Sequence, residues 1–240
     1  MTAVAFRPAA DTPPSGWPAP ERSAFASRAA LRSVGFLARG EIGRDVCLRA
    51  ALEIANAFDR LPSCVDLLDC AGDAPLLDMV LLSRRPAEPI ADAYRAVGDM
   101  VLRTETPVLV LPNHPRARMV GERALVVWDG SLSAISAIRA AAPMLGLART
   151  IMVIDARGET APLAVEIATA FLRALPGERL LDVTRLELES QAAVLDAALL
   201  TDADYLVLGG FGLWNALPDV LYGDFDSALL RAPIPMLLGQ

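Results

Sequence analysis

Lysine is absent from this 240-residue chain: all 22 of its basic residues are arginines, set against 29 acidic residues, for a net charge of −7. Without lysine the chain cannot form a Schiff base or supply the lysine of a Walker-type phosphate loop. Histidine occurs only at His114, so a histidine-based metal site or a Ser-His-Asp triad lacks its residues. The acidic surplus argues against nucleic acid as a partner, because phosphate contacts need clustered positive charge.

Long apolar runs and an even set of cysteines are also missing. The run Pro107–Pro112 is typical, and it is far shorter than the ~20 residues that cross a bilayer. The first residues contain no apolar segment behind a basic one, which argues against a secretory signal. Cys47, Cys64 and Cys70 are odd in number and are expected to be reduced thiols. These absences predict a cytoplasmic protein that has no membrane partner.

The remaining sequence is rich in apolar residues, which make up 54% of the chain. Residues 1–30 form a Pro- and Ala-rich segment without periodicity, which predicts a flexible arm. From there, short apolar runs alternate with helical stretches, an order typical of a parallel α/β sheet. The expected strands are 33–38, 64–68, 79–82, 107–112, 123–128, 150–154, 183–189, 205–208 and 235–238, and the expected helices are 44–58, 90–103, 131–147, 160–175, 190–200 and 216–230.

Two of these strands are expected at sheet edges. Prolines bracket the strand over 107–112, and proline is confined mostly to edge strands or strand ends because it lacks an N–H group. Polar and apolar residues alternate over 183–189, as in a half-exposed strand.

The two halves of the chain match each other in three pairs of segments. The pairs are 32–38 with 123–129, 78–83 with 204–209, and 106–110 with 234–238. The first two landmarks are 46 residues apart in the first half and 81 apart in the second. The interpretation is a tandem duplication with a shortened first domain over 31–112 and a complete second domain over 121–240. The last strands of the two halves, 108–111 and 235–238, are expected to pair with each other.

Ligands in parallel α/β sheets bind at the carboxyl ends of the strands. In the second half these ends carry Asp129-Gly130-Ser131, the loop after Val153-Ile154, and the glycine cluster from Gly209 to Gly212. Glycines there let backbone amides approach a phosphate at a helix N-terminus. They also serve tight turns without any ligand, so both interpretations stay open from the residues alone.

The segments Val126–Ser131, Asp202–Gly212 and Ala232–Leu238 together resemble the universal stress protein family. The resemblance covers about 120–240 well and about 30–112 weakly. It implies two Rossmann-like sandwiches in tandem, of the adenine nucleotide alpha hydrolase-like type, each with a parallel sheet and the first one shortened.

Nucleotide-binding members of this family resemble Gly-x2-Gly-x9-Gly-Ser/Thr, with an aspartate after the first strand. Asp129 matches that aspartate, and Gly209 and Gly212 match the first two glycines. The third glycine is replaced by Tyr222, and Gly223 stands at the Ser/Thr position. The implied ligand is ATP or another adenine nucleotide with Mg²⁺.

The candidate nucleotide-binding residues in the second half are Asp129, Gly130, Val153, Gly209, Gly212 and Gly223. The first half has Arg39-Gly40-Glu41 and Ser83–Pro86 at the corresponding places, so its site is expected to be lost.

The resemblance implies a regulatory stress protein rather than an enzyme. No Ser-Gly-Gly-x-Asp-Ser loop or catalytic histidine constellation is found, so any ATP hydrolysis is expected to be slow, with Asp129 binding the ligand rather than acting as a nucleophile. The alternative is a ligand-free scaffold of the same fold for dimerisation or protein interaction, favoured by the missing Ser/Thr. The expected partners are the chain itself, as a homodimer or an internal pseudo-dimer, and protein partners that the sequence does not identify.

Overall fold

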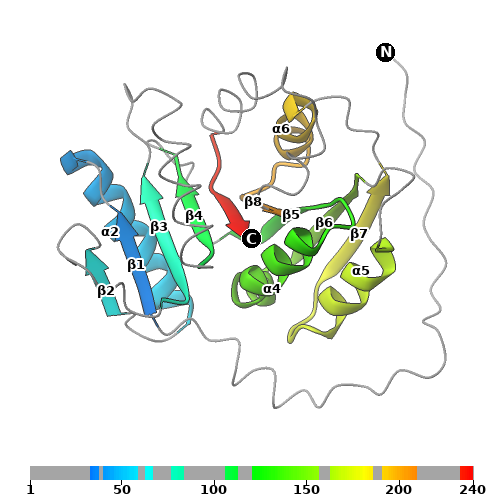
Figure 1. Cartoon of the computed structure of the whole chain (residues 1–240), viewed down its shortest axis with the longest axis horizontal. Coiled ribbons are helices and arrows are strands. Elements are labelled where there is room, and N and C mark those ends of the chain that lie inside the picture. Colours follow the sequence, from blue (N-terminus) through cyan, green and yellow to red (C-terminus); the bar gives the residue numbers. More distant parts are fainter. Residues whose placement is uncertain are drawn as a thin grey trace.

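The computed structural model describes residues 33–37, 40–58, 63–66, 77–83, 106–112, 121–156, 163–185, 191–209 and 233–239. The expected arm over 1–30, the linker over 113–120 and the helices expected over 90–103 and 216–230 lie outside the described residues. Figure 1 shows the described elements as a row of strands with helices on both sides.

Between residues 123 and 209 strands and helices alternate as the sequence predicts. In order, the elements are β1 (Ser33–Leu37), α2 (Gly40–Ala57), β2 (Ser63–Asp66), β3 (Met79–Ser83), β4 (Val108–Leu111), β5 (Arg123–Trp128), α4 (Leu132–Leu147), β6 (Thr150–Asp155), α5 (Val165–Ala174), β7 (Leu180–Arg185), α6 (Gln191–Leu200), β8 (Tyr205–Gly209) and β9 (Met236–Gly239).

The nine strands in the described part of the chain belong to one sheet, in the order β2-β1-β3-β4-β9-β8-β5-β6-β7. Within each half every pairing is parallel, whereas β4 and β9 pair antiparallel and join the halves, with Val108 opposite Leu238 and Val110 opposite Met236. The predicted α/β class with parallel sheets is confirmed, and so is the predicted pairing of the two last strands. The parallel strands of the two halves are therefore joined into one continuous sheet.

The prediction that 107–112 forms an edge strand is wrong. β4 lies inside the sheet between β3 and β9, and all of its residues are buried. Pro107 and Pro112 flank β4 without interrupting it, and the Pro107 carbonyl accepts a hydrogen bond from the Val80 N–H at 2.9 Å. A proline removes only its own N–H, so prolines at the two ends leave the ladder intact.

The strand expected over 183–189 does lie at an edge, since β7 ends the sheet. Its predicted start is wrong, because β7 (Leu180–Arg185) begins three residues earlier, and residues 186–189 of the prediction lie outside the described residues. Each residue between Leu180 and Arg185 is half-buried, as expected for a strand with a neighbour on one side only.

The two faces of the sheet are covered by different helices. On one face the buried side chains of α2, α4 and α5 share a cluster with alternate strand residues, including Trp128 and Tyr205. On the other face, Val194 and Ala198 of α6 pack against the remaining strand residues. This division follows from the period of two in a strand, which sends successive side chains to opposite faces. None of the described helices combines the length and the apolar character needed to cross a membrane.

The alignment of the two halves is off by one residue in its first segment. Met79 in the first half corresponds to Tyr205 in the second, and these residues pair with Val34 and Ala124, respectively. Val34 therefore occupies the place of Ala124, whereas the sequence match had placed Ser33 there. The other two segments agree with the register, because Val80 pairs with Val108 as Leu206 pairs with Met236.

Candidate functional site

The turn after β5 holds a carboxylate at the start of α4. An Asp129 carboxylate oxygen, Oδ1, accepts a hydrogen bond from the Ser131 N–H at 2.9 Å. Gly130 between them has a φ of 76°, a left-handed conformation that favours glycine. Ser131 is the N-cap of α4, and its hydroxyl accepts a hydrogen bond from the Ala134 N–H at 3.1 Å. The sequence therefore encodes both the turn and the cap, and together they fix the Asp129 carboxylate beside a helix N-terminus.

Gly209, the last residue of β8, lies against the same helix turn. A Cβ atom at Gly209 would lie 2.6 Å from the backbone nitrogen of Ala134 and 2.8 Å from its Cα. In the sheet Leu208 pairs with Val127, so the strand ends that carry Gly209 and Asp129 are adjacent. The structure thus brings Asp129, Gly130 and Gly209 together at the first turn of α4.

Val153 has a different position. It lies inside β6 between Val126 and Val183, and its side chain is fully buried in the core. The residue that ends β6 is Asp155, which is only 5% exposed and lies opposite Trp128 of β5. Val153 therefore lies beneath the strand ends, and the polar group at that level belongs to Asp155.

A row of four residues at the carboxyl edge of the sheet extends this site across four strands. Gly209, Trp128, Asp155 and Arg185 follow one another on β8, β5, β6 and β7. The indole N–H of Trp128 is buried and has no hydrogen-bond partner among the described residues. The sequence places Trp128 and Asp155 at the ends of two successive strands, but only the strand register shows that they share a row.

The comparisons with known proteins identify the fold. No protein family profile matches the sequence, and no curated protein sequence is significantly similar to it. Among solved structures, the chain is similar to a protein of unknown function from Pseudomonas aeruginosa PAO1, at 17% sequence identity and a TM-score of 0.52, over 88% of this chain and 93% of that chain. It is also similar to a protein provisionally described as a universal stress protein from Pseudomonas aeruginosa UCBPP-PA14, at 16% identity and a TM-score of 0.51, over 88% of this chain and 94% of that chain.

The chain has the universal stress protein fold. A universal stress protein from Archaeoglobus fulgidus DSM 4304 aligns at 15% identity over 92% of this chain and 93% of that chain, with a TM-score of 0.48.

Within the universal stress protein fold, the described part of the candidate site consists of the α4 turn and the adjacent strand ends. The two remaining candidates, Gly212 and Gly223, lie outside the described residues. In the part of the chain that the structure describes, no group of three or more His, Cys, Asp or Glu side chains is placed to hold a metal ion.

Chemically, the described part of the site offers acceptors more than donors. The first turn of α4 is already capped, since Ser131 binds the Ala134 N–H and Asp129 binds the Ser131 N–H. An ionised carboxylate accepts hydrogen bonds through two oxygens, and among the described residues only Oδ1 of Asp129 is engaged. The remaining oxygen suits a ligand group that donates hydrogen bonds, such as a sugar hydroxyl or an exocyclic amine.

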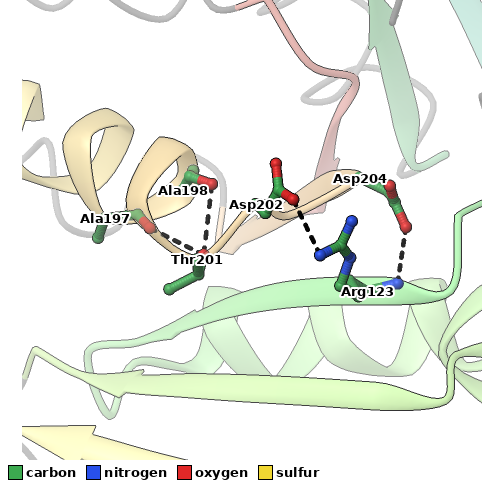
Figure 2. A network of polar contacts seen from close by, with 6 residues as sticks. All are labelled: Arg123, Ala197, Ala198, Thr201, Asp202 and Asp204. Carbon is green, nitrogen blue, oxygen red and sulfur yellow. Dashed lines mark hydrogen bonds and ion pairs between the residues drawn. The ribbon is translucent and has the colours of Figure 1, made fainter. Parts of the chain in front are cut away.

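A polar network at the opposite, amino edge fixes β8 relative to β5 (Figure 2). The Arg123 N–H donates to the Asp204 carboxylate at 2.8 Å, and the Asp204 N–H donates to the Arg123 carbonyl, also at 2.8 Å. The Arg123 guanidinium pairs with Asp202 at 3.0 Å. Thr201 ends α6 by donating its hydroxyl proton to the Ala197 carbonyl at 2.8 Å. These contacts set the register that places Gly209 beside Asp129 at the other end of the strands.

Arg179 lies at the ends of α4 and α5 and interacts electrostatically with Tyr205. The Arg179 guanidinium donates to the carbonyls of Leu172, Gly146 and Pro176, and these carbonyls belong to or follow the last turns of the two helices, where a cation is favourable. Burial lowers the pKa of Arg179, an effect that Tyr205 partly opposes. Burial raises the pKa of the Tyr205 hydroxyl, and the charge of Asp204 raises it further.

Proposed function

We propose that this protein is a universal stress protein-like regulatory protein that binds an adenine nucleotide in its second half. The observation that supports this proposal most directly is the Asp129 carboxylate, held by Ser131 at the first turn of α4 beside Gly209. The proposed ligand is ATP or another adenine nucleotide with Mg²⁺, and the proposed location is the cytoplasm.

The candidate residues have distinct proposed roles. Asp129 accepts hydrogen bonds from the nucleoside, while Gly130 and Gly209 keep the neighbouring backbone free of side chains. Val153 shapes the core under the site. Gly212 and Gly223 contribute to the phosphate end, as the family resemblance implies. When bound, Mg²⁺ would neutralise part of the phosphate charge.

The proposed role is to sense or report the nucleotide rather than to turn it over. The described residues at the site include the polar side chains of Asp129, Ser131, Asp155 and Arg185. None of these is a histidine, the most common general base in enzymes. ATP hydrolysis, if measured, is expected to be slow.

The second candidate function is a ligand-free scaffold that binds itself or other proteins. Its support is the capped first turn of α4, whose Ala134 N–H is bound by Ser131 and is therefore not available to a phosphate. The sequence adds Tyr222 and Gly223 where the family motif has glycine and a hydroxyl residue.

The deciding experiment is to denature protein purified without added ligand, identify any released nucleotide by chromatography, and then titrate the protein with ATP, ADP, AMP and adenosine in the presence of Mg²⁺. The test variant is Asp129→Asn. Its side-chain oxygen can still accept a hydrogen bond from the Ser131 N–H, while its amide group replaces the second acceptor with a donor. The loss of a charged hydrogen bond is expected to raise the Kd at least about tenfold. Asp196→Asn, at an exposed position on α6, is the matched control.

The nucleotide proposal is supported if the protein binds an adenine nucleotide and if Asp129→Asn, but not Asp196→Asn, raises the Kd. No released nucleotide and no binding at millimolar ATP would leave the scaffold as the function. Equal weakening by both variants would place the ligand away from Asp129.

A further inference from the structure

The outer edge of β7 presents an unpaired row of backbone groups. β7 is the terminal strand of the described sheet. The Leu180 N–H donates to the Arg149 carbonyl, at the start of β6. In a parallel ladder, alternate residues of a strand direct both their N–H and C=O groups to the same neighbour. Leu180, Asp182 and Thr184 therefore face β6, and the backbone groups of Leu181, Val183 and Arg185 face outward.

Of the features that usually protect a terminal strand, this edge has two charged residues, Asp182 and Arg185, but neither a bulge nor a proline. Its pairing with β6 runs without a bulge over all six residues, from Thr150↔Leu180 to Asp155↔Arg185. β7 contains no proline, and its first residue, Leu180, is 67% exposed. Ile167 of the adjacent α5 is exposed as well. A regular edge flanked by apolar side chains is a template for pairing with another strand.

The sequence of β7 suits a second copy of itself. Two identical antiparallel strands related by a two-fold axis keep each residue on its own face of the sheet, so a residue can oppose only partner residues of the same face. For six residues, the two registers with the greatest overlap are therefore centred on Asp182 or on Val183. The first places Asp182 opposite Asp182 of the partner subunit, and like charges directly opposite each other are unfavourable.

The register centred on Val183 has complementary pairs instead. Val183 lies opposite Val183 of the partner subunit, and their outward backbone groups exchange hydrogen bonds. Asp182 lies opposite Thr184 of the partner subunit at a position where side chains approach closely, and the threonine hydroxyl can donate to the carboxylate. Leu181 lies opposite Arg185 of the partner subunit, whose aliphatic stem can cover it.

We propose that the protein forms a homodimer through antiparallel pairing of β7 with β7 of a second copy, in the register centred on Val183. β9, the last strand, is already paired on both sides within one chain and has no edge for a second copy. β7 has an outer edge that the pairing between the two halves does not use. The proposed interface does not depend on nucleotide binding, so either proposal can fail without the other.

The test is sedimentation velocity on the full chain over a wide range of protein concentrations. Thr184→Asp places a carboxylate opposite Asp182 of the partner subunit twice per dimer and is expected to raise the dimer Kd about tenfold. Thr184→Lys supplies two opposite-charge pairs instead and is expected to lower the Kd by a similar factor at low salt, and less at high salt. The double variant Asp182→Thr/Thr184→Asp restores the original pairs and is expected to dimerise like the unmodified chain.

Ser136→Asp, at an exposed position on α4, adds the same charge elsewhere and should leave the Kd unchanged. Circular dichroism shows which variants fold. If Thr184→Asp does not fold, Thr184→Lys still tests the proposal. The proposal would be overturned if the unmodified chain is a monomer at all concentrations, or if the dimer Kd does not change with the charge at residue 184.

Discussion

A Cβ atom on Gly43 of α2 would lie 2.3 Å from Oγ of Ser83 and 3.3 Å from its Cβ. Ser83 ends β3, so its side chain fills the space that Gly43 leaves empty in the first turns of the helix. The second half reverses this arrangement, because there the strand ends with Gly209 and the helix contributes Ala134. In both halves a missing side chain lets a helix approach a strand end closely, but the glycine is on the helix in one half and on the strand in the other.

The Gly43–Ser83 contact predicts that Gly43→Ala destabilises the protein when Ser83 is present but stabilises it when residue 83 is glycine. Gly43→Ala alone is expected to lower the free energy of unfolding by about 1 kcal/mol or more, because the new methyl group meets the buried Ser83 side chain. With Ser83→Gly already present, the same change is expected to be stabilising, since alanine is favoured over glycine in a helix by up to about 1 kcal/mol. Urea unfolding of the four proteins measures the coupling, and additive effects would contradict it.

Gly209→Ala is expected to lower the free energy of unfolding by about 1–3 kcal/mol. The obstacle is the α4 backbone at Ala134, which cannot rotate away as a side chain can. Gly146→Ala in the same helix is the matched control, because a Cβ there would meet nothing within 4 Å. The control should stabilise by up to about 1 kcal/mol through helix propensity. Equal effects of the two substitutions in chemical denaturation would refute the close approach at Gly209.

Tyr205 predicts a loss of stability in alkali. Its hydroxyl is fully buried and has no hydrogen-bond partner in the part of the chain that the structure describes, and burial raises its pKa above the ordinary value of 10.0. Above pH 10 the unfolded chain releases this proton while the folded chain retains it, so the free energy of unfolding falls as the pH rises. Below the unfolded pKa this contribution is fully present. Tyr205→Phe is expected to flatten the decline measured by urea unfolding between about pH 9 and pH 11. It should cost little at neutral pH, because an unpaired buried hydroxyl contributes no hydrogen bond.

Asp204 and Asp202 are expected to differ although both contact Arg123. Asp204→Ala removes the acceptor of the Arg123 N–H and is expected to cost about 1–2 kcal/mol. Asp202 forms an exposed ion pair and has a φ of 55°. Asp202→Gly is therefore expected to cost less than about 0.5 kcal/mol, because exposed pairs contribute little and glycine suits that conformation. Thermal unfolding of both variants compares them, and a larger loss for Asp202→Gly would contradict this ranking.

Local signals in the sequence predict the second half well. The strand over Arg123–Trp128 and the serine cap of α4 are where the sequence places them. Both depend on short-range patterns, namely a continuous apolar run bounded by polar residues and an N-cap serine. The same reasoning predicts Asp129, Gly130 and Gly209 as members of one site, because parallel strands end at a common edge.

Long-range decisions were harder to predict. The prolines beside β4 suggested an edge, whereas the predicted pairing with β9 places β4 inside the sheet. The two expectations disagreed, and the structure follows the pairing. The match between Arg32 and Arg123 misled the alignment by one residue, since a shared charged residue does not fix the register of a strand. Register follows from which face is buried, and that is known only once the helices are in place.

By itself, the sequence determined the α/β class, the order of most elements and the turn that holds Asp129, since these depend on residues close together in the chain. Only the tertiary structure decided that β4 is central, that β7 is left as an edge, and that Trp128 and Asp155 join Gly209 in one row. Those outcomes depend on hydrogen bonds and packing between segments far apart in the chain, whose free energies no local pattern contains.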